Sequence, residues 1–269
     1  MPSLDSARGR ARLSDAQLEA VVALLDRRGT RAEHHPATAE LTHAGLVQDG
    51  RPSGFLADLV RDLAAADVVV DLEVAGRDGV SRHGAALVGA RCWFVSGWPG
   101  EAESEYAQID PRLLVHALAL ATGLQQGDPP GGRRPVACSF AQLSSALDAR
   151  GRQERAAGPG DDLGPLRATT VEALTAVPGI SRELADVLAA ERSAWRLTAS
   201  WRHADGRAVR VLAVVDAGDL GLWRREGVPE PLGVEAPPAD TEIRLVPVAA
   251  AEVWREMAAL LPGSAEHRA

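Results

Sequence analysis

Residues 67–79 read Asp-Val-Val-Val-Asp-Leu-Glu-Val-Ala-Gly-Arg-Asp-Gly, and this stretch decides the fold. Val68, Val70, Leu72 and Val74 alternate with residues that are mostly acidic, which is the period of a β-strand with one buried face. The Asp-Gly pair at the end is a strong signal for a tight hairpin turn. The sequence therefore predicts a strand that reverses into a second, antiparallel strand.

Outside this stretch, the spacing of apolar residues along the chain predicts a meander of strands between helices. A helix begins at Ser14, which can cap it, and an amphipathic helix covers 53–66. Asp110 and Pro111 open another helix that ends at Gly123. The segment 37–46 is either helical or irregular. The remaining strands of the meander are expected over 81–88, 91–96 and, shorter, around 106–109.

The pattern then returns in the second half of the chain. Glu183-Leu-Ala-Asp-Val-Leu188 echoes Phe55-Leu-Ala-Asp-Leu-Val60, and Asp205-Gly206 repeats the Asp78-Gly79 turn 127 residues later. Such a duplication usually places two units about a pseudo-twofold axis, and unpaired strand edges favour joining the two half-sheets. The fold class expected is α+β, with two quasi-twofold-related repeats that form one central antiparallel sheet flanked by helical bundles. The second set of elements is expected over 195–201, 207–215, 218–224 and 241–246, followed by a helix from Pro247 to Leu261.

These patterns divide the chain into one composite domain with two repeats. The first repeat covers 14–124 and the second covers 168–262. Between them, 125–167 is expected to be a linker with one helix over 139–149, and 151–165 is expected to be mobile. Residues 1–13 are interpreted as a disordered arm and 263–269 as a tail.

Composition restricts the class of protein. All 29 basic residues are Arg, the net charge is -8, and aromatics make up 4% of the 269 residues, which predicts an aliphatic core. The acidic balance opposes non-specific attraction to nucleic acid. No run of apolar residues is long enough to span a bilayer or serve as a signal peptide, so we expect a cytoplasmic protein without membrane insertion.

No group of residues indicates catalysis. Cys92 and Cys138 lack a motif partner and are interpreted as free core thiols. His34-His35 with His43 matches no spacing typical of metal ligands. We therefore expect no enzyme activity, no catalytic residues, no metal and no cofactor.

One segment suggests an alternative function. Residues 172–190 resemble a helix-hairpin-helix, in which a Pro-Gly-Ile-Gly turn exposes backbone amides to a DNA phosphate. Here the turn reads Pro178-Gly179-Ile180-Ser181, so that Ser181 replaces the second glycine, and Arg182 is the only nearby cation before Glu183. The alternative to nucleic-acid binding is a tight turn between packed helices.

Several segments together resemble the EspG family of type VII (ESX) secretion chaperones. The matches are Leu184-Ala-Asp-Val-Leu188 leading into the 195–201 strand, the Asp205-Gly206 hairpin and the closing helix over 248–261. The resemblance covers about 14–262. It implies a quasi-twofold α+β fold and a cytosolic chaperone without a cofactor. It also implies a helical secretion substrate, of the PE-PPE kind in mycobacteria, that is held soluble until export.

The resemblance also directs attention to candidate contact residues. Family members often have a long loop between the second and third strands, whereas Gly89-Ala90 leaves a tight turn here. That departure implies a different helical substrate or binding through the second repeat alone. Because aromatic residues and Arg dominate interface energetics, Trp201, Arg210 and Trp223 are the predicted partner-binding residues. An inactive scaffold without a secretion role is a third reading, and the oligomeric state is left open.

Overall fold

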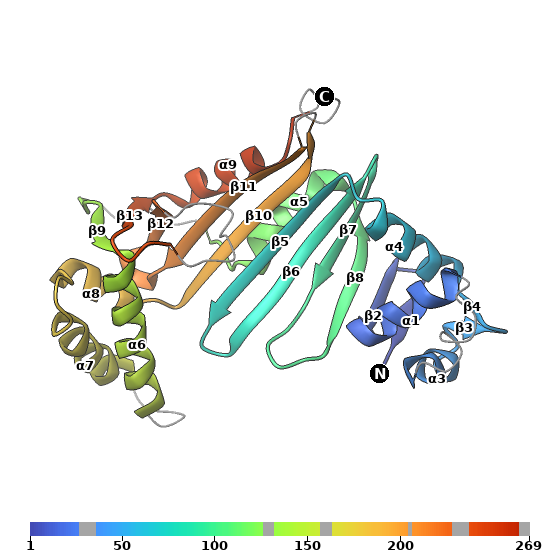
Figure 1. Ribbon diagram of the computed structural model, residues 1–269, viewed down its shortest axis with the longest axis horizontal. Coiled ribbons are helices and arrows are strands. Elements are labelled where there is room, and N and C mark those ends of the chain that lie inside the picture. Colours follow the sequence, from blue (N-terminus) through green and yellow to red (C-terminus); the bar gives the residue numbers. More distant parts are fainter. Residues whose placement is uncertain (27–35, 126–131, 157–162, 204–205, 228–236, 264–269) are drawn as a thin grey trace.

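The computed structural model describes residues 1–26, 36–125, 132–156, 163–203, 206–227 and 237–263 (Figure 1). Its centre is an 11-stranded antiparallel sheet in the order β1-β2-β8-β7-β6-β5-β10-β11-β12-β13-β9. The α+β class and the single continuous antiparallel sheet predicted from sequence are confirmed. No helix among these residues is long and apolar enough to cross a membrane.

Strands and helices alternate in groups along the chain. The strands are β1 (Ser3–Asp5), β2 (Arg10–Ser14), β3 (Val47–Gln48), β4 (Arg51–Pro52), β5 (Val68–Gly76), β6 (Gly79–Val88), β7 (Arg91–Ser96), β8 (Glu103–Ile109), β9 (Val136–Ser139), β10 (Ser193–His203), β11 (Gly206–Asp216), β12 (Leu222–Glu226) and β13 (Glu242–Val248). The helices are α1 (Asp15–Leu25), α3 (Pro36–His43), α4 (Gly54–Ala64), α5 (Leu114–Ala121), α6 (Phe140–Ala156), α7 (Leu163–Thr175), α8 (Arg182–Ala189) and α9 (Ala250–Leu260), with short 3-10 turns at Pro111–Leu113 and Gly218–Leu220.

The two halves of the sheet meet where β5 pairs with β10. Their antiparallel register runs from Gly76 opposite Ser193 to Val68 opposite Trp201. Each of these strands also forms a hairpin with the strand that follows it, β5 with β6 and β10 with β11. The sheet therefore continues without a break from one half of the chain to the other.

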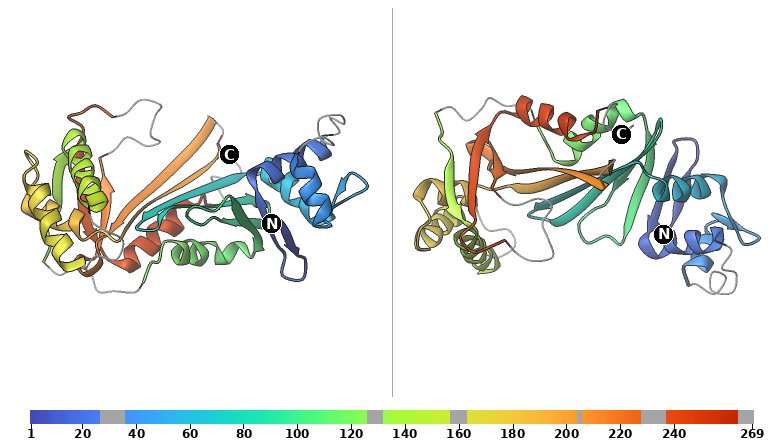
Figure 2. Two further views of the ribbon diagram at one scale, coloured as in Figure 1. Left: turned by 90° about the horizontal axis from the view of Figure 1, so that it is seen from below. Right: turned by 45° about the horizontal axis from the view of Figure 1, so that its top comes forward.

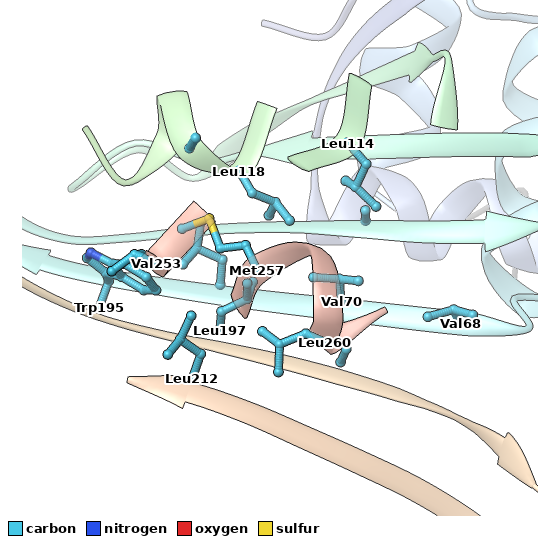
Figure 3. Packing of buried hydrophobic residues seen from close by; sticks show 14 of the residues in the cluster. Val68, Val70, Leu114, Leu118, Trp195, Leu197, Leu212, Val253, Met257 and Leu260 are labelled. Carbon is cyan, nitrogen blue, oxygen red and sulfur yellow. The ribbon is translucent and has the colours of Figure 1, made fainter. Parts of the chain in front are cut away.

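One face of the central strands is covered by α5 and α9. Alternate residues of β5 and β10, such as Val70 and Leu197, point into this layer and are 1% exposed (Figure 3). Leu118 of α5 and Met257 of α9 fill the other side of the same cluster. Burial of these aliphatic side chains supplies the main stabilisation of the central sheet.

Within the part of the chain that the structure describes, helices cover the opposite face only near its two ends. At one end, α1, α3 and α4 pack on the β2-β8-β7 side around a core that includes Leu13 and Trp93. At the other end, α6, α7 and α8 enclose a core that includes Trp223 and Leu245 of β12 and β13. Figure 2 shows both bundles on one side of the sheet and α5 and α9 on the other.

The N-terminal segment differs from the prediction of a disordered arm over 1–13. It forms β1 and β2, and Leu13 is fully buried. Arg10 pairs with Glu105 of β8 at 3.1 Å, and Arg12 reaches Glu103 at 3.1 Å. Arg and apolar residues alternate in this segment, and the Glu residues alternate on its partner strand, so the polar sides pair across the two strands.

The segment 125–167 is more than the predicted linker with one helix. Val136–Ser139 is strand β9, which pairs with β13 at the sheet edge. The predicted helix over 139–149 is present but extends to Ala156. Glu226–Asp240 contains the end of β12, and 228–236 lie outside the described residues, as do 126–131, 157–162, Ala204-Asp205 and 264–269.

Two boundaries in the second half are also corrected. The strand expected over 218–224 begins only at Leu222, because Gly218–Leu220 form a 3-10 turn. Pro247 belongs to β13, opposite Trp223, and α9 begins three residues later at Ala250. The pairing of β9 with β13 stops at Leu245, so β13 is an edge strand at Pro247, where a proline is tolerated.

A buried carboxylate joins α4 to the sheet. Asp62 is 4% exposed, and its Oδ2 accepts a hydrogen bond from Trp93 Nε1 at 2.8 Å. Its Oδ1 accepts a bond from the Arg91 guanidinium. Removing the carboxylate leaves a buried indole N–H without its acceptor.

We predict that Asp62→Ala lowers the free energy of unfolding by about 2–4 kcal/mol, because it breaks a buried charged hydrogen-bond pair. Urea unfolding measures the change. Asp58→Ala is the matched control on the same helix, since its ion pair with Arg61 is exposed and should contribute under about 1 kcal/mol. Equal losses in the two variants would contradict this role for Asp62.

Candidate functional site

The middle of the sheet carries a face that no helix of the described residues covers. We call it the open face, and it lies between the two bundles in Figure 2. It is built by the strand residues that alternate with the core positions of the α5–α9 side. Its members are Val69, Asp71, Glu73 and Ala75 in β5, Val80, Arg82 and Gly84 in β6, Arg196, Thr198, Ser200 and Arg202 in β10, and Arg207, Val209 and Val211 in β11.

Strand register sets the neighbours on this face. Glu73 stands between Arg82 and Arg196 on the two flanking strands, and its Oε2 lies 3.4 Å from Arg82 Nε. Arg202 stands directly opposite Arg207, whose Nη2 donates to Ser200 Oγ at 2.6 Å. The open face is therefore a mixed surface of half-buried valines and charged side chains, which suits protein binding.

A pocket of about 610 Å³ adjoins this face at the tip of the β5–β6 hairpin. The hairpin residues Arg77 and Asp78 line it together with residues of α7 and α8. At its wall Arg150 pairs with Glu191 at 2.6 Å, and Arg167 pairs with Asp219 at 3.0 Å. Two of the four arginines that line the pocket are therefore paired with carboxylates, and the lining as a whole holds four arginines against three acidic residues.

Both cysteines lie in surroundings that disfavour a reactive thiol. Burial raises the pKa of the Cys92 thiol to about 11 and also raises the pKa of Cys138, so both are protonated and unreactive at neutral pH. Burial lowers the pKa of His83, whose Nε2 lies 3.0 Å from Ser81 Oγ. No group of three or more metal-ligating side chains occurs in this part of the chain. His34 and His35 lie outside the described residues.

The three predicted partner-binding residues do not form a surface. Trp201 is 4% exposed in the core beneath α9, and Trp223 is 2% exposed in the core of the α6–α8 bundle. Arg210 stacks on Trp201, with its guanidinium carbon 4.9 Å from the ring centroid, and its Nη1 donates to Ala259 O at 3.0 Å. The prediction is corrected for the two indoles, because both point to core sides of their strands.

Sequence reasoning missed the residues of the open face, although their signal is present. The alternation that identifies Val68, Val70 and Leu72 as core also assigns Asp71 and Glu73 to the other side of the strand. What the sequence lacks is the information that helices leave this side uncovered. That depends on where α4 and α8 pack after the chain folds.

The helix-hairpin-helix-like turn is packed within a bundle. Gly179 has φ +83°, and a Cβ there would overlap the Gln142 side chain of α6. Ser181 caps α8 by accepting from the Leu184 N–H at 3.2 Å. Ser181 thus caps one amide at the start of α8, and Gln142 lies against the turn at Gly179, which favours a tight turn between packed helices.

No family model and no curated protein matches this sequence. A solved structure does match, the Mycobacterium tuberculosis type VII secretion system chaperone EspG5 in complex with a PE25-PPE41 dimer. The alignment covers 94% of this chain and 97% of that chain, with a TM-score of 0.56 and 15% identity. The chain has the fold of EspG5.

The match with EspG5 includes the sheet and both bundles, since it extends over nearly the whole of each chain. At 15% identity the similarity is one of fold. The two-residue turn Gly89-Ala90 between β6 and β7 is confirmed in this chain.

We predict that Arg210→Ala lowers the free energy of unfolding by about 1–2 kcal/mol, because it removes a cation stacked on an indole and a donor to the α9 carbonyls. Thermal or urea unfolding measures this. Arg202→Ala, an exposed change on the neighbouring strand, should stay within about 0.5 kcal/mol. Unchanged stability with weakened partner binding would instead restore Arg210 as a contact residue.

We predict that Gly179→Ala lowers the free energy of unfolding by about 1–3 kcal/mol, because a positive φ and the Gln142 overlap both oppose a side chain. The matched control is Gly54→Ala, at the first residue of α4, where nothing lies within 4 Å of a Cβ. Urea unfolding compares the two variants. A neutral Gly179→Ala would mean that the turn has room for a side chain.

Proposed function

We propose that this protein is a cytosolic chaperone that binds a helical type VII secretion substrate, of the PE-PPE kind or related, and keeps it soluble before export. The observation that carries the proposal is the EspG5 fold over 94% of the chain. The EspG5 structure contains a PE25-PPE41 dimer, so a chaperone of this fold holds such a pair. The proposed activity is binding, without chemistry.

The open face supports this proposal as the docking surface. Val69, Val209 and Val211 are half-buried, and polar residues surround them. Such a surface can cover the apolar end of a helical bundle, which would otherwise aggregate, while the surrounding polar groups pair at the rim. The helical bundles at either end of the face supply side walls for a bound helix pair (Figure 2).

We further propose that the chain consists of two quasi-twofold-related units. The strand order supports this, since β5, β6, β7 and β8 run outward from the centre as β10, β11, β12 and β13 do on the other side. Asp71 pairs with Thr198, and these two residues are also separated by the 127-residue repeat distance. A local twofold axis would therefore pass between them.

Two equivalent helix caps extend the repeat beyond its predicted start. In Ser14-Asp-Ala-Gln17 the Gln17 N–H donates to Ser14 Oγ, and Gln17 Oε1 accepts from the Ser14 N–H. Ser139-Phe-Ala-Gln142 forms the same capping box after β9. We infer that the second unit begins at β9 and includes α6, rather than beginning at 168, and that the first unit begins at β2.

The proposal is tested by capture of the partner from the native cytosol at moderate salt, with mass spectrometry of the bound protein. We expect a small helical secretion substrate. Recovery of nucleic acid would support the hairpin alternative, and a captured protein outside the secretion machinery would support the scaffold reading.

A substitution localises the binding. Thr198→Trp places a bulky ring at the centre of the open face, and we expect at least a tenfold loss of affinity for the captured substrate, because the ring prevents close approach. Leu120→Ser is the control on α5, where Leu120 is 69% exposed on the opposite layer. Titration of the purified substrate measures both. Equal affinities for Thr198→Trp and wild type would move the site away from this face.

A further inference from the structure

We propose that the open face accepts its helical partner in one orientation, with carboxylates of the partner over β10 and β11. The inference rests on the proposed function, and it specifies the chemistry of the substrate surface. The partner's docking end is expected to be acidic on one side, rather than apolar throughout. Arg202 and Arg207 are the residues that would recognise it.

Charge is unevenly distributed over the open face. The β10–β11 half carries Arg196, Arg202 and Arg207, and no acidic residue among its described members. The β5–β6 half carries Asp71 and Glu73, with one cation, Arg82. The second half of the face is therefore positive in a chain whose net charge is -8.

These charges also break the proposed twofold symmetry. Each charged residue has an uncharged residue at the position 127 away in the other unit. The pairs are Val69 with Arg196, Asp71 with Thr198, Glu73 with Ser200, Ala75 with Arg202, Val80 with Arg207, and Arg82 with Val209. A face of roughly twofold shape could accept a helix pair in two directions, and charges that break the symmetry distinguish them.

Two of the arginines face each other across the β10–β11 hairpin. Arg202 and Arg207 are directly opposite in the pairing, and like charges in such positions destabilise a sheet. Within the described residues, the hydrogen bond of Arg207 goes to the neutral Ser200, and neither guanidinium has an ion-pair partner. Asp67, which precedes Val68 opposite Trp201, accepts from the Gly89 N–H at 3.1 Å. A carboxylate from a partner would offset the repulsion between the two arginines.

The acidic half argues against nucleic acid as the occupant. A phosphate backbone laid across the face would pass over Asp71 and Glu73, and the chain as a whole repels polyanions. A helical protein can place its carboxylates on one side only, in register with the arginines. Because Arg forms bidentate bonds with carboxylates, two adjacent guanidinium groups fix direction as well as affinity.

The experiment uses the full-length protein and two synthetic helical hairpins. The hairpins share one apolar face and differ only in the polar positions beside the tip, which are Glu in one and Lys in the other. Fluorescence anisotropy at about 150 mM salt, where exposed charges are screened beyond about 8 Å, measures their affinities. We expect the Glu hairpin to bind at least tenfold more tightly, and Arg202→Glu/Arg207→Glu to reverse this order.

Matched variants separate recognition from net charge. Arg112→Glu/Arg255→Glu makes the same change in charge in the 3-10 turn before α5 and on α9, away from the open face, and should leave the order unchanged. Arg202→Lys/Arg207→Lys keeps the charges and should retain most of the preference. Urea unfolding confirms that each variant is folded.

The outcomes distinguish a failure of the proposed carboxylate recognition by Arg202 and Arg207 from a failure of the proposed chaperone function. Equal binding of the two hairpins, or tighter binding of the Lys hairpin, overturns the proposal that the face recognises carboxylates of the partner. Failure of both hairpins to bind overturns the open face as a site for helices. If the native substrate is captured and Arg202→Glu/Arg207→Glu leaves its affinity unchanged, the proposed chaperone function is retained. Only the proposed recognition of partner carboxylates is then overturned. Equally tight binding of a poly-dT oligonucleotide overturns the acidic helical protein as occupant.

Discussion

The pairing of β5 with β10 is the contact on which the rest of the molecule depends. Nine residue pairs, from Gly76 with Ser193 to Val68 with Trp201, join two half-sheets that would otherwise each expose a long edge. The same two strands supply the inner side of the α5–α9 core, through residues such as Leu72 and Leu197. Loss of this pairing would separate the two halves and open that core to water.

Once the sheet is continuous, the helices can cover only part of it. One pair of helices lies over the centre of one face, and the two bundles lie near the ends of the other. Each bundle has its own core, so each can be filled without reaching the middle strands. The open face is a consequence of this division, since its half-buried valines and charged residues belong to no described core.

The sequence predicts the strands and their joining well because those depend on local period and turn chemistry. Val68 to Val74 and the Asp78-Gly79 turn are recognisable without tertiary information. The N-terminal strands and β9 were missed because β2 and β9 join the main sheet through β8 and β13, which are distant from them in sequence. The contact residues were misplaced for a related reason. Trp201 and Trp223 were chosen because aromatic residues are common in interfaces, whereas packing by α9 and by the α6–α8 bundle buries them.

The β5–β10 contact also has a kinetic meaning for a chain emerging from the ribosome. Val68 and its partner Trp201 are 133 residues apart, so translation at about 5–20 residues per second leaves the β5 edge unpaired for roughly 7–27 seconds. Non-local pairings of this kind also fold slowly. During that interval the nascent first half presents an unpaired apolar strand edge, to which other chains can pair before the second half is made.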